Sequence, residues 1–177
     1  ISLHFNNYSR IIITIIIMCE WRFFMQKTKI CSFFGHRDTS ETISENLYQT
    51  VVKVINDDNI SAFYVGNNGA FDSLARRSVT RAKADFPHIK IYLVFAYLPT
   101  IKDTFLEEKY DGTDYPEGLE SVPKRFAISH RNKWIVTQSD VVIGYVRTSY
   151  GGAYDALHYA ENQKKKVINL GGQNAEL

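Results

Sequence analysis

The chain has 177 residues, of which 45% are hydrophobic, and this length and composition are typical of one globular domain and exclude a disordered chain. A formal net charge of +2 gives no strongly basic character, so we do not expect nucleic acid as a partner. The two cysteines, Cys19 and Cys31, exclude a disulfide framework and favour a cytoplasmic location.

The first 24 residues differ in composition from the rest of the chain. Their apolar run, Ile11–Ile17, is much shorter than the ~20 residues that span a bilayer, so we expect no membrane segment. A signal peptide is the minor alternative, because no small-residue cleavage site follows the run. We expect residues 1–24 to be a non-native or disordered leader, with Met18 or Met25 as the natural start, and residues 25–177 to form a single domain.

The first predicted strand, Lys29–Phe34, is nearly all apolar, as in a parallel strand that is covered on both faces. The residues Gly35–Arg37 follow it directly. A glycine and then groups that donate to phosphate are typical of the first loop of a nucleotide-binding sheet, although a plain surface turn also fits. The next helix is predicted to end at Asn56–Asn59.

The second predicted strand, Ile60–Val65, ends in a loop with two glycines and two asparagines, Gly66–Gly69. These residue types permit close approach of a ligand to the backbone, or they only make a tight turn. Asp72 falls in the first turn of the helix that follows. There a carboxylate can accept from a ribose hydroxyl or a base amino group, or it can complement the helix dipole.

A third strand is predicted over Ile89–Phe95, and a long irregular segment follows it from Ala96 to about Pro123. Segments of this length are commonly lids or binding loops. The apolar face of the helix expected over Arg125–Val136 is predicted to hold Phe126 or Ala127, Trp134 and Ile135. Arg131 and Asn132 lie off that face, where they are solvated or point at a ligand.

A glycine pair joins the fourth predicted strand, Asp140–Val146, to a helix. Arg147 and Tyr150 lie in the connection, and Gly151 and Gly152 end it. Glycines at a helix start let a ligand approach the backbone, and the free N–H groups of the first turn, with the helix dipole, favour phosphate or carboxylate. A tight turn without a ligand is the alternative.

With Lys166–Leu170 as a fifth strand, strands and helices alternate along the chain. The alternation predicts an α/β, Rossmann-like fold with about five parallel strands and helices on both faces. The loops after the first, second and fourth strands should then converge at the carboxyl edge of the sheet. We expect no metal and no cofactor, because the sequence has neither zinc-type Cys/His spacing nor a P-loop.

Five stretches carry a resemblance to a known family: Phe34–Arg37, Gly66–Asp72, Tyr110–Glu120, Ser129–Asn132 and Gly151–Gly152. Together they resemble the SLOG superfamily, in particular its small single-domain bacterial and phage members of unknown function. The superfamily includes DNA-processing protein A and the Lonely Guy phosphoribohydrolases. The resemblance implies a Rossmann-like domain that binds nucleotides or their derivatives.

The phosphoribohydrolases carry the motif Pro-Gly-Gly-x-Gly-Thr-x-x-Glu, whose glutamate helps to cleave the N-glycosidic bond. Here Tyr154 replaces the third glycine, Asp155 the threonine and His158 the glutamate. Two functions stay open. The first is a module that senses or sequesters a nucleotide or an ADP-ribose-like signal, and the second is an enzyme that hydrolyses or transfers at a nucleotide N-glycosidic bond.

The candidate acid–base residues for such an enzyme are Asp72, Asp155 and His36. The expected ligand-binding residues are Gly35, His36, Arg37, Gly66, Asn67, Gly69, Phe71, Asp72, Arg131, Asn132, Arg147, Tyr150, Gly151 and Gly152. Arg37 and Arg147 are expected to share one anionic group. The expected partner is a nucleotide or a nucleotide-derived small molecule, and the sequence leaves a homo-oligomer open.

Overall fold

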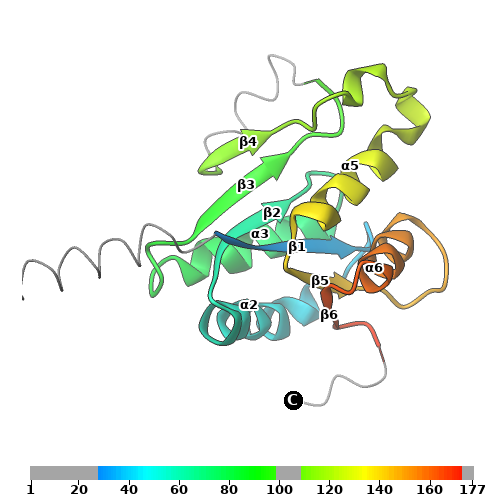
Figure 1. Cartoon of the computed structure of the whole chain (residues 1–177). Coiled ribbons are helices and arrows are strands. Elements are labelled where there is room, and N and C mark those ends of the chain that lie inside the picture. The colour runs from blue at the N-terminus through cyan, green and yellow to red at the C-terminus, as the bar shows by residue number, and fades with distance from the viewer. Residues whose placement is uncertain (1–27, 99–108, 173–177) are drawn as a thin grey trace, which may run out of the picture.

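The computed structural model describes residues 28–98 and 109–172, which form a six-stranded sheet with helices on both faces (Figure 1). The strands are β1 (Lys29–Gly35), β2 (Ile60–Val65), β3 (Lys90–Val94), β4 (Gly112–Asp114), β5 (Val141–Tyr145) and β6 (Lys166–Asn169). The helices are η1 (Glu41–Ile43), α2 (Ser44–Asp58), α3 (Ala70–Ala82), η3 (Leu119–Ser121), α5 (Lys124–Gln138) and α6 (Gly152–Asn162). The leader expected over residues 1–24 lies outside the described residues.

All neighbouring strands pair in parallel, in the order β4-β3-β2-β1-β5-β6. From β1 the chain adds β2, β3 and β4 on one side, and it then returns to place β5 and β6 on the other side. The strand order therefore reverses between β1 and β5, which is where ligands bind in sheets of this kind. The predicted α/β, Rossmann-like parallel sheet is confirmed.

Each face of the sheet has its own apolar core. Cys31, Phe33 and Phe63 pack with the buried faces of α2 and α3 on one side, and Phe34 and Val142 pack with α5 and α6 on the other. This burial on both faces explains why β1 and β5 are nearly continuous apolar runs. Within the described part of the chain, no helix is both long enough and apolar enough to cross a bilayer.

The sixth strand, β4, lies inside the segment that was expected to be irregular. Its position depends on Asp111, whose backbone N–H donates to the Ile91 carbonyl at 2.8 Å and whose Oδ2 accepts from the Ile91 N–H at 2.7 Å. At the other end of the strand, the Phe95 N–H donates to the Asp114 carbonyl at 2.9 Å. The prediction of about five strands is thus corrected to six, with a polar three-residue strand at the edge.

Helix α5 buries a mixed stripe of residues. Ala127 and Ile135 are buried as expected, but Arg131 is buried beside them with an exposed fraction of only 4%. Phe126 instead lies 46% exposed, with the Arg125 guanidinium 4.7 Å from its ring centroid. Of the two predicted alternatives, Ala127 is the core residue. The buried Arg131 therefore needs an explanation other than packing.

Candidate functional site

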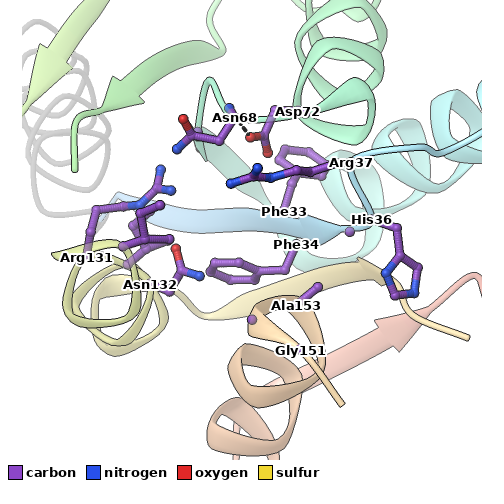
Figure 2. Close-up of a pocket in the computed structure, with 16 residues that line it drawn as sticks. Phe33, Phe34, His36, Arg37, Asn68, Asp72, Arg131, Asn132, Gly151 and Ala153 are labelled. Carbon is purple, nitrogen blue, oxygen red and sulfur yellow. Dashed lines mark hydrogen bonds between the residues drawn. The ribbon is translucent and has the colours of Figure 1, made fainter. Parts of the chain in front are cut away.

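Two adjoining cavities lie at the carboxyl edge of the sheet, at the point where the strand order reverses. The first has a volume of about 230 Å³, and it is lined by the ends of β1 and β2, the start of α6 and one side of α5 (Figure 2). The second has a volume of about 380 Å³ and is lined by the loops that follow β1 and β5. His36 and Gly151 line both cavities, so one extended ligand could occupy the two.

Most of the predicted ligand-binding residues line these cavities. Those in the first cavity are Gly35, His36, Arg37, Gly66, Gly69, Asp72, Arg131, Asn132, Gly151 and Gly152. Those in the second are His36, Arg147, Tyr150 and Gly151. Arg37 and Arg147 therefore lie in neighbouring cavities, and the structure does not bring them to one point. Contact of these residues with a ligand remains a prediction.

Three predicted residues lie elsewhere. Phe71 is 1% exposed and packs beneath Gly35, where its ring stacks on Tyr145 with centroids 6.3 Å apart. Asn67 is exposed and lines neither cavity, whereas its neighbour Asn68 lines the first. Asp155 is exposed on α6 and also lines neither cavity. Phe71 therefore lines neither cavity and supports Gly35 from the core.

Direct contacts fasten the loops to one another. The Ala70 N–H donates to the Arg37 carbonyl at 3.0 Å, and the Arg147 N–H donates to His36 Nε2 at 3.1 Å. A Cβ on Gly35 would lie 2.3 Å from the Phe71 ring, so the glycine is needed for this close approach. The loops after β1, β2 and β5 thus form one packed unit around the first cavity.

The start of α6 lies at one end of the first cavity. Its first helical hydrogen bond runs from the Asp155 N–H to the Gly151 carbonyl, so the preceding N–H groups, from Gly152 to Tyr154, have no partner within the helix. No side chain caps this end, and Gly151 has a φ of 97°, a left-handed conformation that favours glycine. A Cβ on either glycine would meet nothing within 4 Å, so the backbone is open to a ligand.

The opposite wall of the first cavity is polar and carries two buried charges. Asp72 Oδ2 accepts from the Asn68 N–H at 2.9 Å, and burial raises the pKa of this carboxyl, against the lowering effects of that bond and of the Arg131 charge. Arg131 Nη1 donates to the Val94 carbonyl at 3.1 Å, and burial lowers the pKa of its guanidinium. Gly66 lies between the two groups, because a Cβ there would be 2.6 Å from Arg131 Nη1 and 2.8 Å from Asp72 Oδ2.

The three acid–base candidates differ in their surroundings. Asp72 faces the first cavity and has a raised pKa, as a general acid requires. His36 Nε2 is already occupied by the Arg147 N–H, so only its other nitrogen is free of that bond. Asp155 lines neither cavity. In the described ranges, no group of three or more His, Cys, Asp or Glu side chains could hold a metal ion.

Several cavity residues were not predicted. Ile128 and Ile135 line the first cavity beside Arg131 and Asn132, and these four residues are spaced i, i+3, i+4 and i+7 along α5. Helical periodicity from Arg131 would have identified the two isoleucines, because such residues share one helix face. No sequence signal separates Asn68 from Asn67, since both belong to the same glycine-flanked loop.

Comparison with known proteins identifies the fold. No protein-family model and no curated protein sequence matches the chain. DNA processing protein A (DprA) from Streptococcus pneumoniae is 15% identical with a TM-score of 0.59, over 84% of this chain and 52% of that one. DNA processing protein A from Helicobacter pylori is 16% identical with a TM-score of 0.58, over 84% of this chain and 67% of that one. The chain therefore has the Rossmann-like fold of DNA processing protein A, and it spans about half of the length of the first of these proteins.

The expectation that nucleic acid is not a partner is wrong. It is overturned by the DNA processing protein A of H. pylori, a protein with this fold that has a single-stranded DNA binding mode. Net charge is a sum over the whole surface, whereas binding depends on the charge at the site. Here Arg37, Arg131 and Arg147 all line the two adjoining cavities, so the small net charge does not exclude nucleic acid.

Proposed function

We propose that this protein binds the phosphate group of a nucleotide in the first cavity, at the carboxyl edge of the sheet. The observation that carries the proposal is the glycine start of α6, whose free N–H groups line the same cavity as Arg37 and the buried Arg131. Backbone donors, a helix dipole and the Arg37 guanidinium around one cavity favour a phosphate.

The ligand is either a free nucleotide, including an ADP-ribose-like signal that the protein senses or sequesters, or a nucleotide within a single strand. Both present the same nucleoside phosphate to the first cavity. The second cavity extends the site past His36 and Gly151, and it adds Arg147 and the 73% exposed Tyr150. A guanidinium and an exposed aromatic ring suit a further phosphate and a stacked base. The expected cytoplasmic location is part of this proposal.

Calorimetric titration with inorganic phosphate, nucleoside monophosphates, ADP-ribose and short single-stranded oligonucleotides tests the proposal. Arg37→Ala should weaken the binding free energy of every phosphate ligand by about 1.5–3 kcal/mol, which is the scale of a hydrogen bond to a charged group. Arg147→Ala should weaken the binding only of ligands that reach the second cavity. The variant should therefore bind mononucleotides as the parent does and longer ligands more weakly. The matched control is Arg77→Ala, because Arg77 is paired with Glu41 on the exposed side of α3 and lines neither cavity. Equal affinities of the parent and of Arg37→Ala for every ligand would refute the phosphate site.

A second function is favoured by one observation, the raised pKa of Asp72 inside the first cavity. A raised pKa lets a carboxyl keep its proton to a higher pH, and such a group can donate that proton to the leaving base when an N-glycosidic bond breaks. In that case incubation with the same nucleotides releases free base, and Asp72→Asn abolishes the release without abolishing binding. Recovery of unchanged nucleotide leaves binding as the function.

A further inference from the structure

Two buried donors, on residues that line the first cavity, have no hydrogen-bond partner in the part of the chain that the structure describes. Asn68 Nδ2 and Arg131 Nε are both inaccessible to solvent, and neither forms a hydrogen bond with any residue that the structure describes. Both residues line the first cavity, on the wall that also holds Asp72 (Figure 2). An unpaired buried donor is costly to folding, so buried polar groups are nearly always hydrogen-bonded. A bound group that accepts from these donors would explain why they are there.

The two charges on this wall do not satisfy each other. Asp72 and Arg131 are both buried, and their charges influence each other, yet no salt bridge or direct hydrogen bond joins these two described side chains. Asp72 is held by the Asn68 N–H and Arg131 by the Val94 carbonyl. Buried ions of opposite sign normally pair directly, because separation leaves both poorly compensated. The wall thus presents one strong acceptor beside two unpaired donors.

We propose that Asn68, Asp72 and Arg131 form a specificity subsite for an uncharged group that both donates and accepts hydrogen bonds. In a nucleotide, that group is the ribose diol or the hydrogen-bonding edge of the base. The inference rests on the proposed function, because it assigns the phosphate to the Gly151–Ala153 turn. The ligand then lies across the first cavity in one direction, with its phosphate at α6 and its sugar or base at α3 and α5.

The charge of Asp72 decides this direction. A phosphate at the polar wall would face a buried carboxylate, and two like charges in a site of low dielectric repel each other strongly. A hydroxyl or a base N–H instead donates to Asp72, while the neighbouring oxygen or ring nitrogen accepts from Asn68 Nδ2 or Arg131 Nε after these side chains, which solvent does not reach in the free protein, turn toward the cavity. The turn at α6 has the opposite character, because Gly151, Gly152 and Ala153 offer backbone donors and a positive dipole end and carry no carboxylate of their own.

Asn68→Ala tests the subsite in a way that packing alone cannot mimic. The lost Nδ2 group has no hydrogen-bond partner among the described residues, so the variant should melt at the same temperature as the parent or higher. Its affinity for a nucleoside monophosphate should fall roughly three- to tenfold, which corresponds to one ordinary hydrogen bond, while its affinity for inorganic phosphate stays unchanged. Asn67→Ala is the matched control, since Asn67 is exposed in the same loop and lines neither cavity. An unchanged nucleotide affinity of Asn68→Ala overturns the subsite.

Asp72→Asn provides the second measurement. The amide keeps the acceptor for the Asn68 N–H but removes the charge, so nucleotide affinity should fall about tenfold or more while phosphate affinity holds or rises. If the subsite binds the ribose diol, deoxyribonucleoside monophosphates should bind more weakly than ribonucleoside monophosphates. If it binds the edge of the base, affinity should instead differ among monophosphates of the four bases. Equal losses for nucleotide and phosphate overturn the subsite alone. A parent that binds neither nucleotide nor phosphate overturns the proposed function, and the subsite with it.

Discussion

Substitution of Gly152 by aspartate should separate binding from stability. Gly152 begins α6, its φ is outside the left-handed region, and a Cβ there would meet nothing within 4 Å. The aspartate can therefore be accommodated without strain. At this position a carboxylate stabilises the helix by about 0.3–1 kcal/mol through its interaction with the helix dipole. Loss of the glycine adds about 0.4–1 kcal/mol to the free energy of unfolding, because it restricts the unfolded chain. The free variant should be at least as stable as the parent.

The same carboxylate should displace a phosphate. It occupies the N–H donors that the phosphate needs, and each hydrogen bond lost to a charged group costs about 1.5–3 kcal/mol. Repulsion between the two anions adds to this, so an affinity loss of about a hundredfold is expected. For a parent at a ligand concentration ~100-fold above its Kd, binding stabilises the fold by about 2.7 kcal/mol, and at a hundredfold weaker affinity this falls to about 0.4 kcal/mol.

A thermal-shift titration measures both effects. In a domain of this size 1 kcal/mol corresponds to roughly 2–4 °C, so the parent should gain about 5–10 °C from a saturating nucleotide and Gly152→Asp only about 1 °C. Gly172→Asp is the matched control, because Gly172 is exposed, lines neither cavity, and an added Cβ there would make only ordinary contacts at 3.7 Å. The reasoning is refuted if Gly152→Asp keeps the full shift of the parent.

Three further predictions concern the wall and the sheet. Burial favours the protonated form of Asp72, so its pKa is higher in the folded protein than the ordinary value of about 3.8. The free energy of unfolding of the parent, compared with that of Asp72→Asn, should therefore fall as pH rises from about 3.8 through the raised pKa. Denaturant titrations across pH measure this difference, and parallel profiles of the two proteins contradict it. Gly66→Ala should lower the free energy of unfolding by about 1–3 kcal/mol, because the added Cβ would lie 2.6 Å from Arg131 Nη1. An unchanged midpoint of urea unfolding would contradict this contact. Burial and the 3.0 Å bond to Asp114 raise the pKa of Tyr64 to about 12, so Asp114→Asn should lower this pKa in an absorbance titration.

The central strands could be predicted because burial on both faces leaves an apolar run in the sequence. Strand β4 left no such run, since Gly112–Asp114 is polar and only three residues long. Its position depends on the contacts of Asp111 with Ile91, and these residues are far apart in the sequence. Edge strands fixed by distant hydrogen bonds cannot be read from local periodicity.

The sequence predicts which glycines and charged residues belong to the candidate site, but it predicts less well how they are arranged. Gly35 and Gly66 are predicted from the sequence as ligand-binding residues, but an added Cβ on them would meet Phe71 and Arg131, and the sequence cannot show which group comes close. The loop motif predicts a ligand contact for Phe71, whereas the position of this residue on α3 turns its ring into the core. Burial of Arg131 was not predicted, because charged residues are rarely buried.

The residues at the carboxyl edge fall into two groups with opposite effects on the free protein. Gly35 and Gly66 let the loops pack, so their replacement should harm folding whether or not a ligand is present. The Asn68 side-chain Nδ2 and the space beside Gly152 contribute no contact to the described part of the free fold, since Nδ2 has no partner there and a Cβ on Gly152 would meet nothing within 4 Å. Replacement of Asn68 or Gly152 should therefore leave stability equal or higher while it weakens binding, as is common where groups are set for a ligand and not for packing. The contacts between Arg37 and Ala70 and between His36 and Arg147 already hold the loops together, so a ligand does not have to order them, and its binding energy depends mainly on the groups that it touches.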